Sequence, residues 1–323
     1  MAARVMLLSP WDPAVVRGWL EGRSIDVVTA PDPPAPDALL ALAPDAEVVI
    51  SDNRHQHRLD RPILERLVRC RLIQVPAVGF DAIDHRAAAD LGIPVANCAA
   101  YNRDAVADWV VMAMLNLLRR GAYGDRKMHD GGWPFSELTG RELGYQTVGI
   151  IGLGNVGAAV AARLSGFGCR VLFTDVIPRG FLGARQVPLD QLLAEADIVT
   201  VHTPLDHDTR ALIGARALAA MKPGAFLVSA ARGPIVDEAA LVAALREGHL
   251  AGAALDVYEV EPLPADSPLR AMENVFLSPH AGGATEQARA RALEMVRANL
   301  LRVLDGEEPF NVVNGVGRRQ VPV

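Results

Sequence analysis

The chain contains 323 residues, half of them hydrophobic, and carries a formal charge of -6 at pH 7. This length is more than one core usually takes, so two domains are expected, and the composition excludes a disordered or fibrous protein. A phosphate backbone would repel the negative charge, which argues against nucleic acid as a partner.

Cysteine usage and the apolar runs predict where the protein resides. The three cysteines, Cys70, Cys98 and Cys169, lie far apart and are odd in number. They fit reduced thiols better than a disulfide framework or a metal cluster, so no metal site is expected. The first apolar run is too short for a signal peptide, and none approaches the roughly 18 residues that span a bilayer. The prediction is a cytoplasmic protein with no membrane partner.

The first hundred residues alternate short apolar runs with amphipathic segments such as 61–69 and 85–91. Continuously apolar strands that alternate with helices predict a parallel sheet covered on both faces, and hence a small doubly wound α/β domain. The strands expected here are Val5–Leu8, Ile25–Thr29, Val48–Ser51, Leu72–Val75 and Pro94–Ala96.

Residues 104–120 follow with little polar surface, which predicts a long helix buried on several sides. We expect this helix to pack at a domain junction and against a second subunit. The stretch from Gly121 to Tyr145 is polar and glycine-rich, but it holds Trp133 and Phe135. It forms either an arm across a partner subunit or a long surface loop.

A second series of strands and helices begins at Thr147 and leads to a last long helix, Glu286–Leu304, whose apolar residues recur at helical spacing. This series predicts a second parallel sheet covered by helices. Its expected strands are Val148–Gly152, Arg170–Thr174, Ile198–His202, Phe226–Ser229, Ala251–Val257 and Val275–Ser278.

The first of these strands runs directly into a glycine-rich turn and a helix, which is typical of a dinucleotide site. In such a turn the first glycine allows the tight bend, the second lets the backbone approach a pyrophosphate, and the third allows close helix–strand packing. A lone GxGxxG pattern is weak, but strand, turn and helix occur here in the required order. The residues of the turn are Gly152, Gly154, Asn155, Val156 and Gly157, with Leu153 between the first two glycines.

The next strand ends at Asp175, 18 residues after Gly157. A carboxylate at this position accepts hydrogen bonds from ribose hydroxyls and repels a 2′-phosphate, which favours NAD over NADP. The alternative is that Asp175 caps a turn. Arg179 follows four residues later and softens the discrimination, so NADP is disfavoured rather than excluded.

Proton transfer at a nicotinamide site needs an acid–base group, and two of the eight histidines stand at the ends of apolar strands. These are His202 and His280, whereas the other histidines lie in polar loops, turns or a helix start. The carboxyl ends of parallel strands rim the ligand crevice of an open sheet. Spacing alone does not choose between the two.

Seven blocks of sequence, in order along nearly the whole chain, resemble the D-isomer-specific 2-hydroxyacid dehydrogenase family. The blocks are VGFDAID at 78–84, NRDAVADW at 102–109, GLGNVG at 152–157, HTPLDHDTRALI at 202–213, SAARGPIVDE at 229–238, ALDVYEVEPLP at 254–264 and SPHAGGAT at 278–285. The resemblance implies a Rossmann NAD-binding domain, residues 100–288, inserted into a flavodoxin-like substrate-binding domain, residues 1–99 and 289–323. It also implies NAD as cofactor, a small 2-hydroxy or 2-keto acid as substrate, and a homodimer formed through the 104–120 helix.

The same resemblance assigns a catalytic trio. Arg232 would pair with the substrate carboxylate and polarise its carbonyl through a rigid fork of donors. His280 would give a proton to the keto oxygen, or take one from the alcohol in the reverse direction. Glu261 would favour the charged imidazole and fix its tautomer. The choice of Glu261 over Asp256 and Glu259 rests wholly on the resemblance. Each residue also has an ordinary structural alternative, as a cap, a strand-end histidine or a surface acid.

Further contacts also follow from the family blocks. The substrate is expected to meet the backbone at Val78 and Gly79 and the side chain of Asn102. The other cofactor contacts are expected at His202, Thr203, Pro204, Ala230, Asp256 and Gly282. Two residues or pairs depart from the usual family blocks, and we expect them to alter the rim of the pocket or the closure of the domains. Asp108 stands where the family usually has glutamate, and Asp206-His207 replaces a Thr-Pro pair.

The family spans several substrates, and the residues narrow them only in part. Glyoxylate, hydroxypyruvate, 3-phosphoglycerate, larger 2-keto acids and phosphite remain open. Glu261 argues against formate, because formate dehydrogenases carry glutamine there. The loop 52–60, with Arg54, His55, His57 and Arg58, either binds a substrate phosphate or is solvated, and charged loops are usually solvated. A non-catalytic NAD sensor, like the transcriptional corepressors of this fold, is the alternative from another class.

Overall fold

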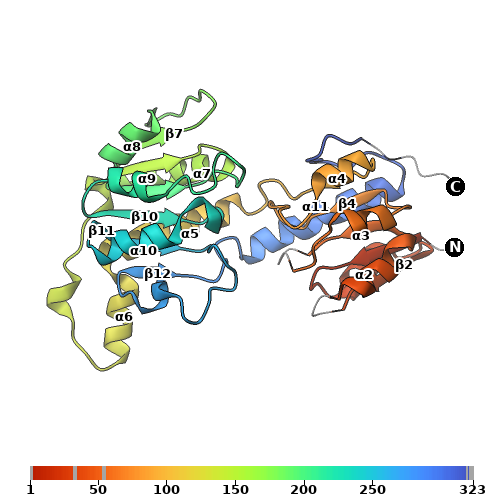
Figure 1. Cartoon of the computed structure of the whole chain (residues 1–323), viewed down its shortest axis with the longest axis horizontal. Helices are drawn as coiled ribbons and strands as arrows, with labels where there is room; N and C mark the ends of the chain where they lie inside the picture. The colour runs from red at the N-terminus through yellow and green to blue at the C-terminus, as the bar shows by residue number, and fades with distance from the viewer. Residues whose placement is uncertain (1–2, 32–34, 53–55, 318, 320–323) are drawn as a thin grey trace. The chain divides into compact units, whose positions relative to one another are not determined.

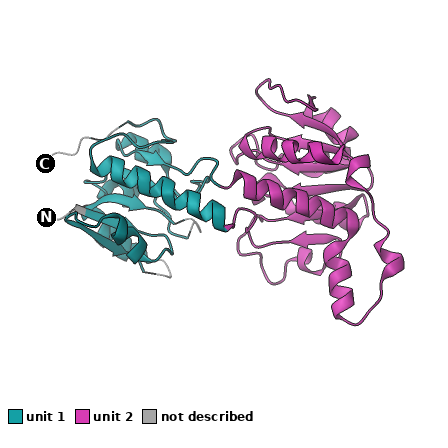
Figure 2. Ribbon diagram, turned by 180° about the vertical axis from the view of Figure 1, so that it is seen from behind, with its two compact units in different colours: residues 1–101, 286–323 teal, residues 102–285 magenta. Residues whose placement is uncertain are grey.

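The computed structural model describes residues 3–31, 35–52, 56–317 and 319. The chain forms two compact units, one of residues 1–101 with 286–323 and the other of residues 102–285 (Figure 2). The first unit therefore contains both ends of the chain, and the second is a continuous insertion. Each unit is built around one parallel sheet.

The sheet of the first unit has the strand order β2-β1-β3-β4-β5 and parallel neighbours throughout. This is the order of flavodoxin-like folds. Its strands are β1 (Ala3–Leu7), β2 (Ile25–Thr29), β3 (Ala46–Ile50), β4 (Leu72–Gln74) and β5 (Val95–Ala96). Its helices are α1 (Pro13–Trp19), α2 (Pro36–Leu42), the 3-10 turn η1 (Ala43–Asp45), α3 (Arg61–Arg66), α4 (His85–Asp90) and α11 (Glu286–Leu304).

Both faces of this sheet are covered, as alternating apolar side chains require. Met6 of β1 belongs to one core cluster with α2, α3 and α4, whereas the next residue, Leu7, belongs to a second cluster with α1 and α11. Figure 1 shows α2, α3 and α4 in front of the sheet, and Figure 2, seen from behind, shows α11 on the other side. The unbroken apolar runs of the sequence are therefore buried from two directions.

The sheet of the second unit has the order β12-β11-β10-β9-β6-β7-β8 with parallel neighbours, which is the Rossmann arrangement. Its strands are β6 (Thr147–Ile151), β7 (Arg170–Thr174), β8 (Ala184–Gln186), β9 (Ile198–Val201), β10 (Ala225–Ser229), β11 (Leu250–Leu255) and β12 (Val275–Leu277). Its α-helices are α5 (Arg103–Arg119), α6 (Gly121–His129), α7 (Asn155–Leu164), α8 (Leu189–Glu195), α9 (Ala215–Ala220) and α10 (Glu238–Arg246). Its 3-10 turns are η2 (Phe135–Leu138), η3 (Leu143–Tyr145), η4 (Ser165–Phe167), η5 (Gly233–Ile235) and η6 (Pro268–Ala271). The predicted fold class, a Rossmann domain inserted into a flavodoxin-like domain, is confirmed.

Helix α5 packs on the Rossmann sheet of its own unit. Ten of its 17 residues are buried, and together with α7 it covers one face while α8, α9 and α10 cover the other (Figures 1 and 2). Trp109 stacks on Phe276 of β12 with ring centroids 6.1 Å apart. Asp108 accepts a hydrogen bond from Nε of Arg163 in α7, so this departure from the family pattern ties two helices together. The helix is as buried as its sequence predicts.

Two features of this unit differ from the sequence prediction. Residues 121–129 form helix α6 instead of extended arm or loop, beginning after Arg120 in a left-handed conformation with φ 51°. Gly121 and Gly124 have low helix propensity, so the sequence does not predict this helix. The guanidinium of Arg120 lies 4.1 Å from the centre of the Tyr123 ring and helps to stabilise the helix. Strand β8 was not predicted either, because its three residues include no apolar run. Among the described residues, no helix is long and apolar enough to cross a membrane.

Candidate active site

Three neighbouring strands bring the predicted catalytic trio to one edge of the Rossmann sheet. Arg232 follows β10, Glu261 follows β11 and His280 follows β12, and these strands are adjacent in the order β12-β11-β10. Because parallel strands share a direction, the residues that follow them emerge at the same edge. The structure therefore assembles residues that are 48 positions apart in sequence.

His280 and Glu261 form a direct ion pair. Nδ1 of His280 donates to Oε2 of Glu261 at 2.7 Å, and the other carboxylate oxygen accepts the backbone amide of Tyr258 at 3.0 Å. Partial burial would raise the pKa of the Glu261 carboxyl, but the bond and charge of His280, the Tyr258 amide and the charge of Arg232 outweigh it. The pKa of Glu261 is therefore lowered, and the carboxylate stays charged at neutral pH.

Arg232 lies within electrostatic range of Glu261, whose pKa its guanidinium helps to lower. The arginine is half-buried, and its Nη1 donates to the carbonyl of Ala231 at 2.7 Å. The following residue must be glycine, because a Cβ at Gly233 would lie 1.8 Å from the carbonyl oxygen of Tyr258. This close approach joins the turn of Arg232 to the loop of Glu261.

A buried aspartate holds the turn that carries His280. Asp256 is 2% exposed, and its carboxylate accepts hydrogen bonds from the hydroxyl of Ser278 and the amides of Ala281 and Gly282. The backbone amide of His280 also donates to the carbonyl of Asp256 at 2.8 Å, and His280 itself has φ 53°. A left-handed conformation costs a non-glycine residue about 1–2 kcal/mol, so these bonds stabilise a position that is not intrinsically favoured.

The predicted glycine turn lies between β6 and α7 at the same edge of the sheet. Gly152 has φ 91°, and a Cβ at Gly157 would lie 2.1 Å from the carbonyl oxygen of Gly152, so the helix can pack this closely only with glycine there. Gly154 is the N-cap of α7, and within the described residues no side chain caps it. The first amides of α7, from Asn155 and Val156 onward, therefore point to a place for an anion, as a pyrophosphate requires.

Asp175 follows β7 and is bonded to the glycine turn. Its Oδ2 accepts the amide of Leu153 at 2.8 Å, its Oδ1 accepts the amide of Ile177 at 3.0 Å, and Nε of Arg179 lies 3.2 Å from Oδ2. Burial opposes ionisation, but the two amides and Arg179 outweigh it and lower the pKa of Asp175. A charged acid thus stands beside the turn, at the position that binds ribose in Rossmann domains.

The segment after β9 contributes the remaining predicted cofactor contacts of this edge. Nε2 of His202 lies 2.9 Å from Oγ1 of Thr200, and burial lowers the pKa of His202 to about 4, so the ring is neutral at pH 7. The buried hydroxyls of Thr203 and Ser229, on neighbouring strand ends, have no hydrogen-bond partner in the described part of the chain. Pro204 and Ala230 adjoin them. Buried hydroxyls usually have a hydrogen-bond partner, so these two fit a polar ligand such as NAD at this edge.

The expected substrate contacts are divided between the two units. Val78 and Gly79 lie in the first unit, in the loop between β4 and α4, where the side-chain amide of Asn97 donates to the carbonyl of Val78 at 2.7 Å. Asn102 lies in the second unit as the N-cap of α5, next to Gly283, where a Cβ would be 2.5 Å from its Nδ2. Arg54 and His55, which were considered for a phosphate site, lie outside the described residues.

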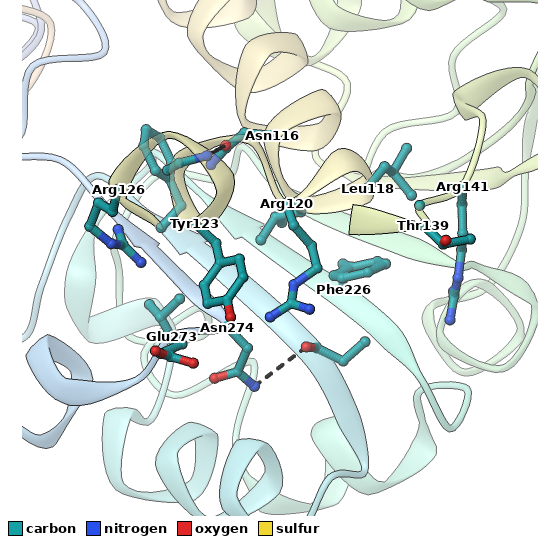
Figure 3. A pocket seen from close by; sticks show the side chains of 16 residues that line it. Asn116, Leu118, Arg120, Tyr123, Arg126, Thr139, Arg141, Phe226, Glu273 and Asn274 are labelled. Carbon is teal, nitrogen blue, oxygen red and sulfur yellow. Dashed lines mark hydrogen bonds between the residues drawn. The ribbon is translucent and has the colours of Figure 1, made fainter. Parts of the chain in front are cut away.

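Some contacts of the site were not predicted from sequence. Glu238 and Glu259 each accept the other's backbone amide and so join α10 to the loop of Glu261. Gln186 of β8 bonds the turn after Asp175. No sequence motif predicts the contacts of these side chains. A cavity of about 180 Å³ lies where β10, β11 and β12 begin, at the opposite edge of the sheet from the predicted trio. Arg120, Tyr123 and Phe226 are among the residues that line it (Figure 3).

Comparison with known proteins finds the same family that the sequence blocks resemble. A sequence model of the family described as "D-isomer specific 2-hydroxyacid dehydrogenase, NAD binding domain" matches residues 111–282. A glyoxylate reductase from Korarchaeum cryptofilum is 39% identical over 290 residues, which cover 87% of each chain. A D-3-phosphoglycerate dehydrogenase from Mycobacterium leprae is 36% identical over 90% of this chain and 56% of its own.

Solved structures agree over almost the whole length. A glyoxylate reductase from Paecilomyes thermophila superposes with a TM-score of 0.89 at 27% identity, covering 97% of this chain and 98% of that one. An NAD-dependent formate dehydrogenase from Staphylococcus aureus, in complex with NAD, gives a TM-score of 0.87 at 30% identity, covering 99% and 100%.

Proposed function

The chain belongs to the D-isomer specific 2-hydroxyacid dehydrogenase family, and we propose that it reduces glyoxylate or a similarly small 2-keto acid. The enzyme is an NAD-linked oxidoreductase of hydroxy and keto acids. Six glyoxylate reductases are 36–40% identical to it over 86–88% of its length, which supports a small substrate. The observation that carries the proposal is the ion pair of His280 and Glu261 beside Arg232.

Each member of this group has one task in the proposed reaction. Bound NADH supplies the hydride that reaches the carbonyl carbon. Arg232 pairs with the substrate carboxylate through its planar fork and polarises the carbonyl. His280 holds the proton: its Nδ1 is bonded to Glu261, which leaves Nε2 to give the proton to the keto oxygen. Glu261, charged at neutral pH, stabilises the imidazolium and fixes the orientation of the ring.

The two units divide the binding of the reactants in this proposal. Residues 102–285 hold the cofactor, with the pyrophosphate at the N-terminus of α7 and the ribose at Asp175. Residues 1–101 and 286–323 form the substrate-binding domain through the backbone at Val78 and Gly79. Thr203 and Ser229, whose hydroxyls have no partner among the described residues, adjoin the cofactor.

A homodimer and a cytoplasmic location complete the proposal. Helix α5 is largely covered by its own sheet, so the apolar surface left for a partner subunit lies at Met112 and in the segment of Trp133 and Phe135, which are 42%, 80% and 81% exposed. The three cysteines are free thiols, which fits a reducing compartment.

Turnover with a panel of keto acids tests the proposed function. The absorbance of NADH is followed with glyoxylate, hydroxypyruvate, phenylpyruvate and 3-phosphohydroxypyruvate, and the first two should give the highest kcat/KM. His280→Ala should lower kcat by about 100-fold or more while NADH still binds, because it removes only the proton donor. Tight NADH binding without turnover of any acid would contradict the proposal and favour an NAD sensor.

A further inference from the structure

The turn after β7 carries two opposite charges where the proposed function places the adenosine ribose. Nε of Arg179 lies 3.2 Å from Oδ2 of Asp175, and the two side chains are 40% and 9% exposed. The same carboxylate accepts the amides of Leu153 and Ile177. A carboxylate offers about four lone-pair positions, so these three contacts leave roughly one for a ribose hydroxyl. Arg179 thus shares the Asp175 carboxylate with the position left for a ribose hydroxyl.

The edge strand β8 holds Arg179 in this place. Oε1 of Gln186 accepts the backbone amide of Arg179 at 3.0 Å. The side-chain amide of Gln186 donates to the carbonyl of Asp175 at 3.1 Å and to that of Ile177 at 3.3 Å. One glutamine therefore bonds both ends of the turn, and it fixes the backbone of Arg179 beside the carboxylate while the guanidinium keeps access to solvent.

We propose that Arg179 is a second determinant of cofactor choice, a phosphate-binding residue that Asp175 holds out of use. The inference rests on the proposed function, because it takes the dinucleotide to bind at this turn. When Asp175 is charged, it pairs with the guanidinium and repels a 2′-phosphate, so NAD is preferred. When that charge is removed, Gln186 still anchors Arg179, and its planar fork faces the 2′ position with no competing partner.

The physical reason lies in what the guanidinium can bind. A guanidinium can bind a phosphate through two parallel hydrogen bonds. In the contact with Asp175, only Nε of Arg179 is bonded, to the single oxygen Oδ2. A 2′-phosphate carries more charge than a ribose hydroxyl, so it gains more from Arg179 and loses more to Asp175. The two residues therefore act in opposite directions on NADPH, whereas NADH depends mainly on Asp175.

The test measures the affinity of the full chain for NADH and NADPH by fluorescence titration, together with kcat/KM for glyoxylate with each cofactor. Asp175→Asn should weaken NADH binding and strengthen NADPH binding, each by about tenfold, which corresponds to one charge-assisted hydrogen bond or ion contact. In the Asp175→Asn background, Arg179→Ala should weaken NADPH binding by about fivefold or more, whereas in the wild type it should change the affinity for either cofactor by less than about threefold. In the double variant the NADPH gain should disappear.

Two further variants separate this effect from damage to the fold. Arg185→Ala changes an arginine that lies in β8 and pairs with Glu195, and it should leave both affinities as they are. Asp175→Ala repeats the charge removal without the amide of asparagine, and both variants are checked by thermal melting. The inference is overturned if the wild type binds NADH tightly but Arg179→Ala leaves NADPH affinity unchanged in the Asp175→Asn background. A wild type that binds neither dinucleotide overturns the proposed function, and this inference with it.

Discussion

Replacing Glu261 by glutamine removes the charge beside His280 while keeping a hydrogen-bonding side chain of the same size. The ion pair spans 2.7 Å, but the side chains are 39% and 37% exposed, so solvent screens it strongly. Coulomb attraction at this exposure, discounted for water, amounts to about 1 kcal/mol. Since one pH unit corresponds to about 1.4 kcal/mol, the pH profile of proton transfer should move by roughly one unit.

The direction of the shift follows from which form of the imidazole each reaction needs. Keto-acid reduction needs the protonated ring, which loses its stabilising partner, so in Glu261→Gln reduction should fail at lower pH than in the wild type. Alcohol oxidation needs the neutral ring and should extend to lower pH. Because the pKa of Glu261 is lowered, the carboxylate of the wild type stays charged above about pH 5 and does not itself shape the profile there.

The assay is kcat/KM against pH in both directions, with NADH and glyoxylate for reduction and NAD and a 2-hydroxy acid for oxidation. Glu259→Gln is the matched control, because this neighbouring acid bonds Glu238 rather than His280. Its profile should coincide with that of the wild type. If the profiles of Glu261→Gln stay in place in both directions, the electrostatic role of Glu261 is wrong.

The structure supports three more predictions. Gly157→Ala places a Cβ 2.1 Å from a backbone oxygen and should weaken NADH binding at least about tenfold in a fluorescence titration, whereas Gly166→Ala, with no described atom within 4 Å, should not. Arg232→Lys should lower kcat/KM for the keto acid by about 100-fold in steady-state assays, since lysine lacks the planar fork, and equal kcat/KM would argue against carboxylate binding there. The pKa of His202 is lowered to about 4 in the folded chain. As pH falls below about 6.5, this histidine is therefore protonated in the unfolded chain but not in the folded chain, and the folded state loses stability. His202→Asn should therefore lose less stability between pH 7 and pH 5 in urea titrations, and identical losses in both proteins would refute this linkage.

Strands and helices with a strong apolar pattern were predictable from sequence. Strand β7 and helix α11 begin and end where the sequence places them, because burial on their apolar sides decides their conformation. Helix α6 and strand β8 were missed for the opposite reason. Tertiary contacts hold them, such as Arg120 over Tyr123 and Gln186 beneath the turn of Asp175, and their own residues give little sign of either conformation.

The site divides in a similar way. Spacing did not choose between His202 and His280, but the structure gives only His280 a carboxylate partner, while His202 lies beside Thr200. Among the neighbouring acids, Glu261 bonds the imidazole and Asp256 holds its turn. Such distinctions depend on where loops converge in space, which a linear pattern does not contain.

The side chains proposed to carry the proton and bind the carboxylate, which follow β10, β11 and β12, all come from one uninterrupted stretch of chain, residues 102–285. The hydrogen bonds of Asp256 and Tyr258 that orient them, and the close packing at Gly233, belong to the same stretch. A chimera that takes its flanking segments from a relative would thus keep all of these residues and change only the other unit. In the proposed mechanism, substrate range can then diversify without any change in how the proton is delivered.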